Sequence, residues 1–381
     1  MRLLPLFPDY RTLCILLIFL GLEPAAAQVV MPERTPVVID QFVQQLMDSA
    51  HIPGLSVAII QGNRLQYSQG YGLTTTDSSQ RVTSATVFDA ASLSKPVFAY
   101  AVLQLVDEGV LALDTPLFNY LPYTDIASDE RYKQITTRMV LSHQTGFPNW
   151  RKNRKSKVLS LLFTPGQRFG YSGEGFVYLQ KVVQKLTGKP LNELMTERVF
   201  GPLQMTRSSY IWNPAFDTNF ALPHDESGQV EPKGKPEQPN VAYSLQTTAD
   251  DYARFVIAIL TGSGLKLKTA DQMLSRQTQL PKKLFGEDGL SPSLSWGLGF
   301  GLEHTPAGDY FWHWGDNGSY KCYVTASREQ GNALVYFTNS ANGLNISREM
   351  VTHFLGGDHP APEFLGYAPH RKDSPSPAAK R

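Results

Sequence analysis

A serine and a lysine three residues apart, Ser92 and Lys95, open the most predictably helical stretch of the sequence, residues 92–106. Residues three apart lie on the same face of a helix, about one turn from each other. The spacing therefore predicts that the lysine amine lies beside the serine hydroxyl, which gives a weak nucleophile an adjacent base. Because backbone N–H groups at a helix start are unpaired, the N–H of Ser92 is also a candidate oxyanion donor.

The Ser-x-x-Lys spacing alone is weak evidence, because it also occurs at Ser263 and Lys266. That second pair lies in a glycine-rich loop, where no helix holds the lysine against the serine. Ser92 instead precedes a strong helix, and Pro96 in the first helical turn costs no hydrogen bond. A serine at a helix start also has a purely structural role as an N-cap, and the local sequence favours neither role over the other.

Two further residues with useful chemistry follow in the chain, each close to glycine. Tyr171 lies in a glycine-rich segment, residues 165–175, which predicts a phenol that projects from a loop. It can act as a base only if its pKa falls well below ~10, which a nearby Lys95 ammonium would promote. His313 ends a strand-like run, and Gly315 would let a substrate approach the strand backbone. Each residue also has a structural alternative, a tyrosine that packs a turn and a satisfied strand histidine.

In this order the residues resemble the three motifs of the serine β-lactamase and penicillin-binding-protein superfamily. The matching segments are Ser92-Leu93-Ser94-Lys95, Tyr171-Ser172-Gly173 and His313-Trp314-Gly315. Stretches at residues 141–148, 202–206 and 247–255 are similar to the class C-like branch, which includes esterases and D-amino-acid peptidases. The resemblance covers roughly residues 36–356.

The resemblance implies a role for each matching residue. Ser92 would be the nucleophile and Lys95 its proton partner. Tyr171 would be the general base in acylation and would activate water in deacylation. Gly315 and the backbone N–H near Asp316 would complete the substrate and oxyanion site. Only the backbone of Asp316 is implied, since a carboxylate that faces an oxyanion is unfavourable.

Two departures from the family pattern bear on the substrate. Gly173 replaces the asparagine that usually ends the second motif, so a contact to a substrate amide is missing. His313 stands where many members carry lysine; it would hold the phenol or a substrate carboxylate, but it lacks a permanent charge. Both changes lower the expected β-lactamase activity and leave ester or peptide-type acyl transfer intact.

Three other residues are interpreted as structural. Glu174 is expected to face solvent at a helix start, and His143 is expected to be structural because the base role is already filled. Cys322 lies in an apolar stretch, as a small buried core residue would. No Cys/His cluster has zinc spacing, so neither a metal nor another cofactor is expected.

The elements that must position these residues indicate an α+β fold. Apolar residues at helical spacing predict helices at residues 37–47, 92–106, 175–186, 250–260 and 346–354. Strand patterns occur at residues 55–60, 65–71, 295–302, 310–314, 321–327 and 333–338. Because strands lie near both ends, we expect one antiparallel sheet built from both chain ends and flanked by the terminal helices. A mostly helical lobe at about residues 112–290 would be inserted, with the substrate in the cleft between the two parts.

The ends of the chain differ in composition from its body. Residues 1–27 combine arginines, an apolar run and three alanines, the layout of a secretory signal cleaved near Ala27; an uncleaved anchor is the alternative. Residues 28–357 would form the hydrolase domain, and residues 358–381, rich in Pro, Lys and Ser, a flexible tail. Periplasmic or secreted localisation is therefore expected.

The charge balance of the chain bears on its partners. With 35 Lys and Arg against 34 Asp and Glu, no nucleic-acid partner is expected. The basic run at residues 151–157 could attract an anionic envelope surface, although a solvated loop is favoured.

The sequence predicts a serine hydrolase that forms an acyl-enzyme on Ser92 and hydrolyses a small ester or a peptide-type amide. A penicillin-binding D-alanyl carboxypeptidase, a weak class C-like β-lactamase and a non-catalytic binding or sensor protein are the alternatives.

Overall fold

Strands from both ends of the chain pair into one antiparallel sheet in the computed structural model, which describes residues 35–126, 128–152, 158–286 and 289–367. The eight strands follow the order β2-β1-β10-β9-β8-β7-β6-β5. Their bounds are β1 (Gly54–Gln61), β2 (Arg64–Gly72), β5 (Thr278–Pro281), β6 (Leu290–Trp296), β7 (Gly301–Thr305), β8 (Gly308–Asp316), β9 (Lys321–Ser327) and β10 (Asn332–Thr338). The α+β fold with a sheet built from both chain ends is therefore confirmed.

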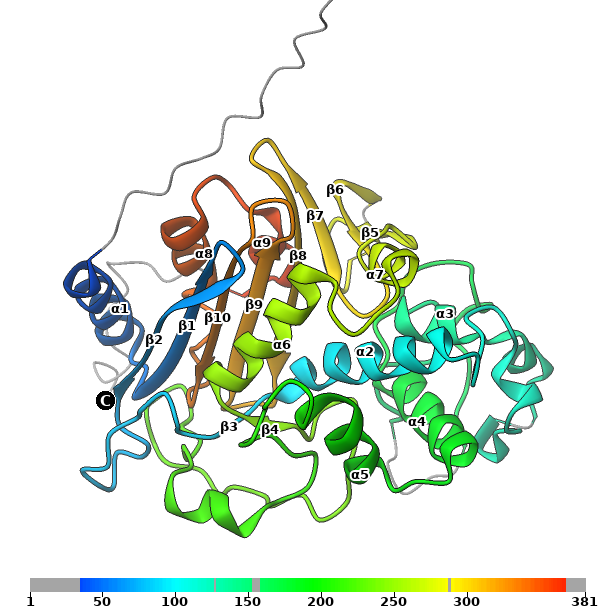
Figure 1. The fold of residues 1–381 in the computed structure, drawn as a ribbon, viewed down its shortest axis with the longest axis horizontal. Helices are drawn as coiled ribbons and strands as arrows, with labels where there is room; N and C mark the ends of the chain where they lie inside the picture. The colour runs from blue at the N-terminus through cyan, green and yellow to red at the C-terminus, as the bar shows by residue number, and fades with distance from the viewer. Residues whose placement is uncertain (1–34, 127, 153–157, 287–288, 368–381) are drawn as a thin grey trace, which may run out of the picture. The chain divides into compact units, whose positions relative to one another are not determined.

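Helices cover both faces of this sheet, so its central strands are buried on both sides. β9 is buried along all seven residues, and β1 along all but its last. Helices α1 (Pro36–Ala50), α8 (Ser347–Leu355) and α9 (Pro360–Leu365) pack on one face. Helices α2 (Ser94–Asp107) and α6 (Ala249–Thr261) pack on the other, and Figure 1 shows α6 in front of β9 and β10.

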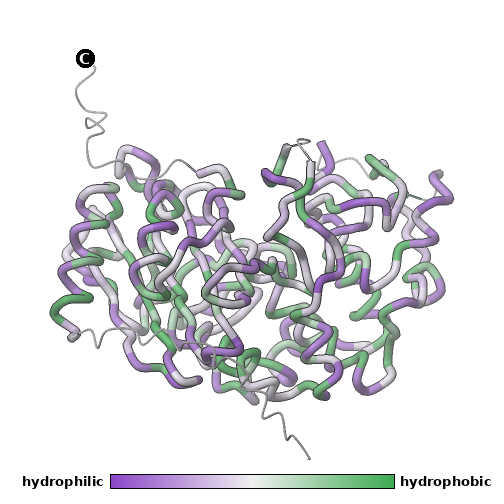
Figure 2. Tube along the Cα trace, turned by 90° about the horizontal axis from the view of Figure 1, so that it is seen from above, coloured by the Kyte–Doolittle hydropathy of each residue, from purple (hydrophilic) through white to green (hydrophobic). Residues whose placement is uncertain are grey.

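Helix α1 illustrates how the outer helices form. Pro36 occupies the first helical position, where its missing N–H costs nothing, and His51 ends the helix with a left-handed φ of 54°. The buried residues Ile39, Val43 and Met47 recur at helical spacing, so one face of the helix is apolar. Figure 2 shows the same alternation of hydrophilic and hydrophobic residues along the outer helices.

The chain between α2 and α6 consists mainly of short helices and loops. Its longest described helix is α4 (Gly173–Thr187), which begins after the N-cap Ser172 and ends at Gly188 in a left-handed conformation. The other elements are α3 (Thr137–Leu141), α5 (Leu191–Met195), a π-helical turn at Thr196–Phe200, and 3-10 turns at Leu117–Asn119, Thr124–Ile126, Glu130–Gln134 and Pro214–Thr218. A two-stranded sheet of β3 (Phe88–Asp89) and β4 (Gln246–Thr247) connects the start of α2 to the start of α6, and α7 (Leu267–Met273) follows α6.

Two predicted boundaries are corrected by the sheet. Residues 295–302, predicted as one strand, form the end of β6 and the start of β7, with a break at Gly299. Gly299 has φ +102°, and a Cβ there would lie 2.6 Å from the Cβ of Ala99 on α2, so the break lets the strands approach that helix. The helical lobe is smaller than residues 112–290, because α6 packs on the sheet and β5 belongs to it.

The tail predicted from residue 358 onward is also corrected in its first part. Helix α9 lies there, and its residue Phe364 is buried in the core. Nδ1 of His359 lies 2.5 Å from a carboxylate oxygen of Glu303 on β7, and both side chains are buried. The rest of the predicted tail, residues 368–381, lies outside the described residues, as do the predicted signal at residues 1–27 and most of the basic run, residues 153–157.

Candidate active site

Ser92 lies in a short 3-10 turn, Ala91–Leu93, that leads directly into α2. Nζ of Lys95, in the first turn of α2, lies 3.0 Å from Oγ of Ser92 and donates a hydrogen bond to the carbonyl oxygen of Ala242 at 2.7 Å. The structure thus brings together the serine and the lysine whose spacing suggested a nucleophile and its base. Ser92 does not act as an N-cap, because no side chain caps either this turn or α2.

The side chain of Lys95 is fully buried, and no carboxylate pairs with it among the described residues. Because burial disfavours the charged form, the pKa of Lys95 falls from 10.5 to about 7. A substantial fraction of this amine is therefore unprotonated near neutral pH. That fraction can accept the proton of Ser92.

Tyr171 was predicted to project from a loop. It belongs instead to a buried aromatic cluster. It is 7% exposed, and its ring packs against the rings of His143 and Trp314 with centroid separations of 4.2 and 4.8 Å. Burial raises the pKa of Tyr171, and the nearby Ser92 hydroxyl offsets only part of this effect. The prediction of a lowered pKa is therefore wrong. The phenol keeps its proton, because burial disfavours the charged phenolate.

His143, interpreted as structural from the sequence, holds the backbone on both sides of Tyr171. Its carbonyl oxygen accepts a hydrogen bond from the N–H of Gly170 at 2.7 Å, and its Nδ1 accepts one from the N–H of Ser172 at 3.0 Å. It adopts a left-handed φ of 55°, which is strained for a residue other than glycine. His143 is thus structural, as predicted, and the sequence did not show that it positions the backbone of Tyr171. The available signal was its place in a stretch, residues 141–148, that matches the family.

His313 lies on β8, completely buried and neutral. Its Nδ1 lies 2.7 Å from the carbonyl oxygen of Trp314, which puts the ring proton on Nδ1. Burial and the charge of Lys95 lower the pKa of His313 to about 3. A neutral, buried imidazole cannot supply the charge that a lysine would supply at this position, and a contact of His313 with the phenol or with a substrate carboxylate stays a prediction.

Gly315 lets the turn that carries Ser92 pack against β8. A Cβ at position 315 would lie 2.2 Å from Sγ of Cys322 and 2.7 Å from the carbonyl oxygen of Ala90. Gly315 thus permits a close approach of the chain itself, and the approach of a substrate to the strand backbone stays a prediction. Ala91, directly before Ser92, has a left-handed φ of 45°, a conformation that costs about 1–3 kcal/mol outside glycine. Packing against β8 holds the nucleophile in this strained turn.

A buried carboxylate also holds the turn. Asp89 accepts hydrogen bonds from the N–H of Ala91 and from Nδ2 of Asn317, both at 2.8 Å, and forms an ion pair with Lys233. The side chains of Asp89 and Lys233 are 8% and 9% exposed, so water cannot easily replace either partner. The network connects the turn before α2 to the loop that follows β8.

Replacing Asp89 with alanine is expected to destabilise the protein by about 3 kcal/mol, because Lys233 would remain buried without its counter-charge. Urea unfolding at pH 7 would measure the change. The matched control is Asp217→Ala, which breaks an ion pair with Lys235 whose side chains are 48% and 54% exposed. That change is expected to cost no more than about 1 kcal/mol. Similar losses in the two variants would contradict a structural role for the Asp89 pair.

Asp316 ends β8, and its carboxylate binds other side chains. One oxygen lies 2.6 Å from Nζ of Lys321, and the other accepts a hydrogen bond from the hydroxyl of Tyr367 at 2.5 Å. β7 pairs with β8 only up to Trp312, so no described strand pairs with that edge of β8 at residues 313–316. This edge is the position that the resemblance implies for the second oxyanion donor, and that role stays a prediction.

Trp150 fills the space beside Gly173, where the family usually has asparagine. A Cβ at position 173 would lie 2.5, 2.7 and 2.9 Å from three atoms of the indole ring. The ring of Trp150 meets the ring of Tyr243 edge to face, with centroids 5.6 Å apart. Where the family usually has the amide of an asparagine, this protein has Gly173 and, beside it, the aromatic ring of Trp150.

Glu174 was predicted to face solvent. It is instead 4% exposed and forms an ion pair with Arg151. Its carboxylate oxygens lie 2.9 and 2.6 Å from Nε and Nη2 of Arg151, whose Nη1 lies 2.8 Å from Asp125. Arg151 opens the predicted basic run, and these carboxylates neutralise its charge within the protein. The basic run at residues 151–157 was interpreted as a solvated loop, and this interpretation is wrong for its first residue, Arg151.

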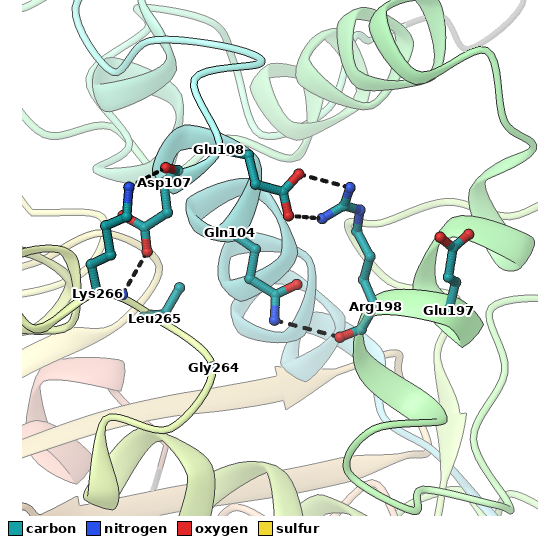
Figure 3. A pocket seen from close by; sticks show the side chains of 8 residues that line it. All are labelled: Gln104, Asp107, Glu108, Glu197, Arg198, Gly264, Leu265 and Lys266. Atoms are coloured by element: carbon teal, nitrogen blue, oxygen red, sulfur yellow. Dashed lines mark hydrogen bonds and ion pairs between the residues drawn. The ribbon is translucent and has the colours of Figure 1, made fainter.

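The second Ser-x-x-Lys pair belongs to a different cavity, at the C-terminal end of α2. Lys266 reaches Asp107 through both its backbone N–H and its Nζ, and not Ser263. Across the same cavity Arg198 pairs twice with Glu108, at 2.8 and 2.9 Å, as Figure 3 shows. These contacts bind side chains at the surface, and they do not place the amine of Lys266 beside the hydroxyl of Ser263.

Two features of the described residues bear on other kinds of site. In this part of the chain, no three His, Cys, Asp or Glu side chains gather closely enough to hold a metal ion. None of the helices described is both long and apolar enough to cross a membrane. Cys322 is a buried core residue, as predicted, and its Sγ donates to the carbonyl oxygen of Ala90 at 3.2 Å.

Comparisons with known proteins agree with this fold and these motifs. The family model described as Beta-lactamase matches residues 39–352. Protein flp of Staphylococcus aureus is 25% identical over 231 residues, which cover 56% of this chain and 46% of that protein. A β-lactamase of Pseudomonas fluorescens is 25% identical over 271 residues, which cover 68% of this chain and 73% of that enzyme. The chain thus spans about half the length of the flp relatives that it matches.

Two solved structures have the same fold. The octameric penicillin-binding protein homologue from Pyrococcus abyssi aligns with a TM-score of 0.72 and 22% identity, covering 85% of this chain and 78% of that one. The D-alanine carboxypeptidase AmpC from Burkholderia cenocepacia aligns with a TM-score of 0.70 and 18% identity, covering 84% and 97%. Fold and motifs together define the class of β-lactamase and penicillin-binding-protein-like serine hydrolases. The chain belongs to the β-lactamase family, as its motifs predicted.

Proposed function

We propose that this protein cleaves a small ester or a peptide-type amide through an acyl-enzyme on Ser92. The observation that carries the proposal is the 3.0 Å approach of Nζ of Lys95 to Oγ of Ser92, in a site whose burial lowers the pKa of Lys95 to about 7. An unprotonated amine at this distance accepts the hydroxyl proton as the oxygen attacks.

In the acylation step, Oγ of Ser92 bonds to the substrate carbonyl carbon while its proton passes to Nζ of Lys95. The backbone N–H groups of Ser92 and Asp316 stabilise the oxyanion. The bond to the leaving oxygen or nitrogen then breaks, and the leaving atom takes the proton of the Tyr171 hydroxyl. The phenolate regains a proton from the ammonium of Lys95.

Deacylation uses the same serine and lysine. A water oxygen bonds to the acyl carbon while Lys95 takes one proton from that water. The bond from the carbon to Oγ of Ser92 then breaks, and Oγ takes the proton back, which releases a carboxylic acid. The raised pKa of Tyr171 supports a role as proton donor to the leaving group, and not the role of general base that the resemblance implied.

Two observations support an ester or a peptide-type amide over an acidic β-lactam. His313 is neutral and buried, so it offers no permanent charge to a substrate carboxylate. Trp150 fills the space of the asparagine that would contact a substrate amide. The β-lactamase of Pseudomonas fluorescens among the relatives makes β-lactam hydrolysis the second candidate. Turnover of nitrocefin that exceeds turnover of p-nitrophenyl acetate would favour it.

Brief treatment with a small fluorophosphonate is expected to add one phosphonyl group to the wild-type protein, detected by intact mass. Ser92→Ala is expected to gain no mass. Ser263→Ala, which removes the serine of the second Ser-x-x-Lys pair, serves as the matched control and is expected to react like the wild type. Labelling of Ser92→Ala at the wild-type rate would end the assignment. A folded wild type that resists labelling would instead support a binding or sensor protein.

A further inference from the structure

The side chain of Asp316 places a negative charge where β8 meets the turn that carries the nucleophile. Gly315, directly before it, packs so closely on that turn that an added Cβ would lie 2.7 Å from the carbonyl oxygen of Ala90. Asn317, directly after it, donates a hydrogen bond to Asp89 at 2.8 Å. A free carboxylate at this place would repel the negative charge that develops on the substrate oxygen in the mechanism proposed above.

Three groups bind this carboxylate. Oδ1 of Asp316 lies 2.6 Å from Nζ of Lys321 and accepts a hydrogen bond from the N–H of Gly318 at 2.9 Å. Oδ2 accepts a hydrogen bond from the hydroxyl of Tyr367 at 2.5 Å. The side chain of Asp316 is 31% exposed, so burial alone does not fix its direction. Lys321 supplies a counter-charge at one oxygen, and Tyr367 fixes the other.

Helix α9 brings Tyr367 to this position from a distant part of the chain. The helix is anchored at its start, where the buried side chain of His359 pairs with that of Glu303 on β7. Gly366 ends the helix with a left-handed φ of 76°, and the next residue reaches the end of β8. The ring of Tyr367 packs against the apolar cluster that contains Tyr171. The contact with Asp316 is therefore held by the fold from two sides.

Tyr367 acts in this contact as a donor. Burial raises the pKa of Tyr367, and the negative charge of Asp316 raises it further, so the hydroxyl keeps its proton. Nζ of Lys321 also lies over the Tyr367 ring, 5.3 Å from the ring centre. A phenylalanine at position 367 would keep this ring and its packing and would remove only the hydrogen bond to Asp316.

We propose that Tyr367 is a positioning residue for the reaction, whose hydroxyl, together with Lys321, holds the Asp316 carboxylate away from the oxyanion. The backbone N–H of Asp316 can then stabilise the oxyanion without interference from its own side chain. The inference rests on the proposed function. It gives the segment after α9, which the sequence predicted as the start of a flexible tail, a part in the reaction.

Replacing Tyr367 with phenylalanine is expected to lower kcat/KM for p-nitrophenyl acetate by about tenfold, because the released oxygen of Asp316 can turn toward the substrate. The loss should stay below the ~10²-fold or more that removal of an oxyanion donor costs, since the donor itself remains. In an Asp316→Asn background the same change is expected to cost less than about twofold, because no charge remains to be held. Thermal unfolding of all four proteins would show that each is folded.

The rate of fluorophosphonate labelling on the same four proteins is a second measurement, because the phosphoryl oxygen of the reagent needs the same donors. The pattern should match that of ester hydrolysis. Tyr67→Phe is the matched control: the hydroxyl of Tyr67 also donates to a carboxylate, that of Asp40, at 2.5 Å. Tyr67 lies on β2, four strands from β8 in the sheet, so its replacement should leave both rates at the wild-type level.

Two results would overturn the inference without touching the proposed function. One is a wild-type rate in Tyr367→Phe. The other is an equal loss in the two backgrounds, since a purely structural role of Tyr367 does not depend on the charge at position 316. In both cases fluorophosphonate still labels Ser92 in the wild type. A folded wild type that resists labelling would instead overturn the proposed function itself.

Discussion

Replacing Lys95 with methionine is expected to lower kcat/KM for p-nitrophenyl acetate by about 10²- to 10⁴-fold, the usual contribution of a general base. Methionine fills a similar volume but cannot accept the Ser92 proton. The protein should remain folded, because an apolar side chain suits a fully buried position better than an amine does. Initial rates at pH 8, together with thermal unfolding of both proteins, would measure the two effects.

The pH profile of the same reaction separates Lys95 from other bases. Lys95 must be unprotonated to act, so kcat/KM should rise about tenfold per pH unit below about 7 and level off above it. The rise should disappear in Lys95→Met. Neither His313 nor His143 can mimic it, because burial lowers the pKa of His313 to about 3 and that of His143 well below its usual value.

Lys266→Met is the matched control, because it removes the lysine of the second Ser-x-x-Lys pair. Its activity and pH profile should equal those of the wild type. A Lys95→Met variant that retained the wild-type rate, or the same rise near pH 7, would show that another group accepts the Ser92 proton.

Replacing Gly315 with alanine is expected to cost at least about 10²-fold in kcat/KM and about 3 kcal/mol or more in unfolding free energy. The added Cβ would lie 2.2 Å from Sγ of Cys322 and 2.7 Å from the carbonyl oxygen of Ala90, so the turn must move away from β8. Displacing a nucleophile by about 1 Å is enough for such a loss of rate. Urea unfolding and ester hydrolysis on the same preparation would test both.

The glycine prediction has a control and an internal check. At Gly234 an added Cβ has no atom within 4 Å, so Gly234→Ala should change neither property. Adding Cys322→Ala to Gly315→Ala should restore only part of the stability, because the carbonyl oxygen of Ala90 remains in the way. Full activity in Gly315→Ala would show that the turn of Ser92 does not depend on its packing against β8.

The elements with clear periodicity could be predicted from the sequence because each depends on its own pattern. Helix α1 and strands β1, β9 and β10 lie close to their predicted ranges, since apolar spacing and turn residues define them locally. The break at Gly299 and the helix at residues 360–365 could not be predicted in the same way. They depend on contacts with α2 and with the sheet, which no local pattern contains.

The order of Ser92, Lys95, Tyr171 and His313 along the chain was sufficient to identify the family and the fold class, because motif residues are a property of the sequence. Their electrostatic state was decided by the tertiary structure alone. Burial lowers the pKa of Lys95 and raises that of Tyr171, which reverses the proton roles that residue types suggest. Desolvation depends on everything that surrounds a group, and those surroundings come from segments hundreds of residues apart.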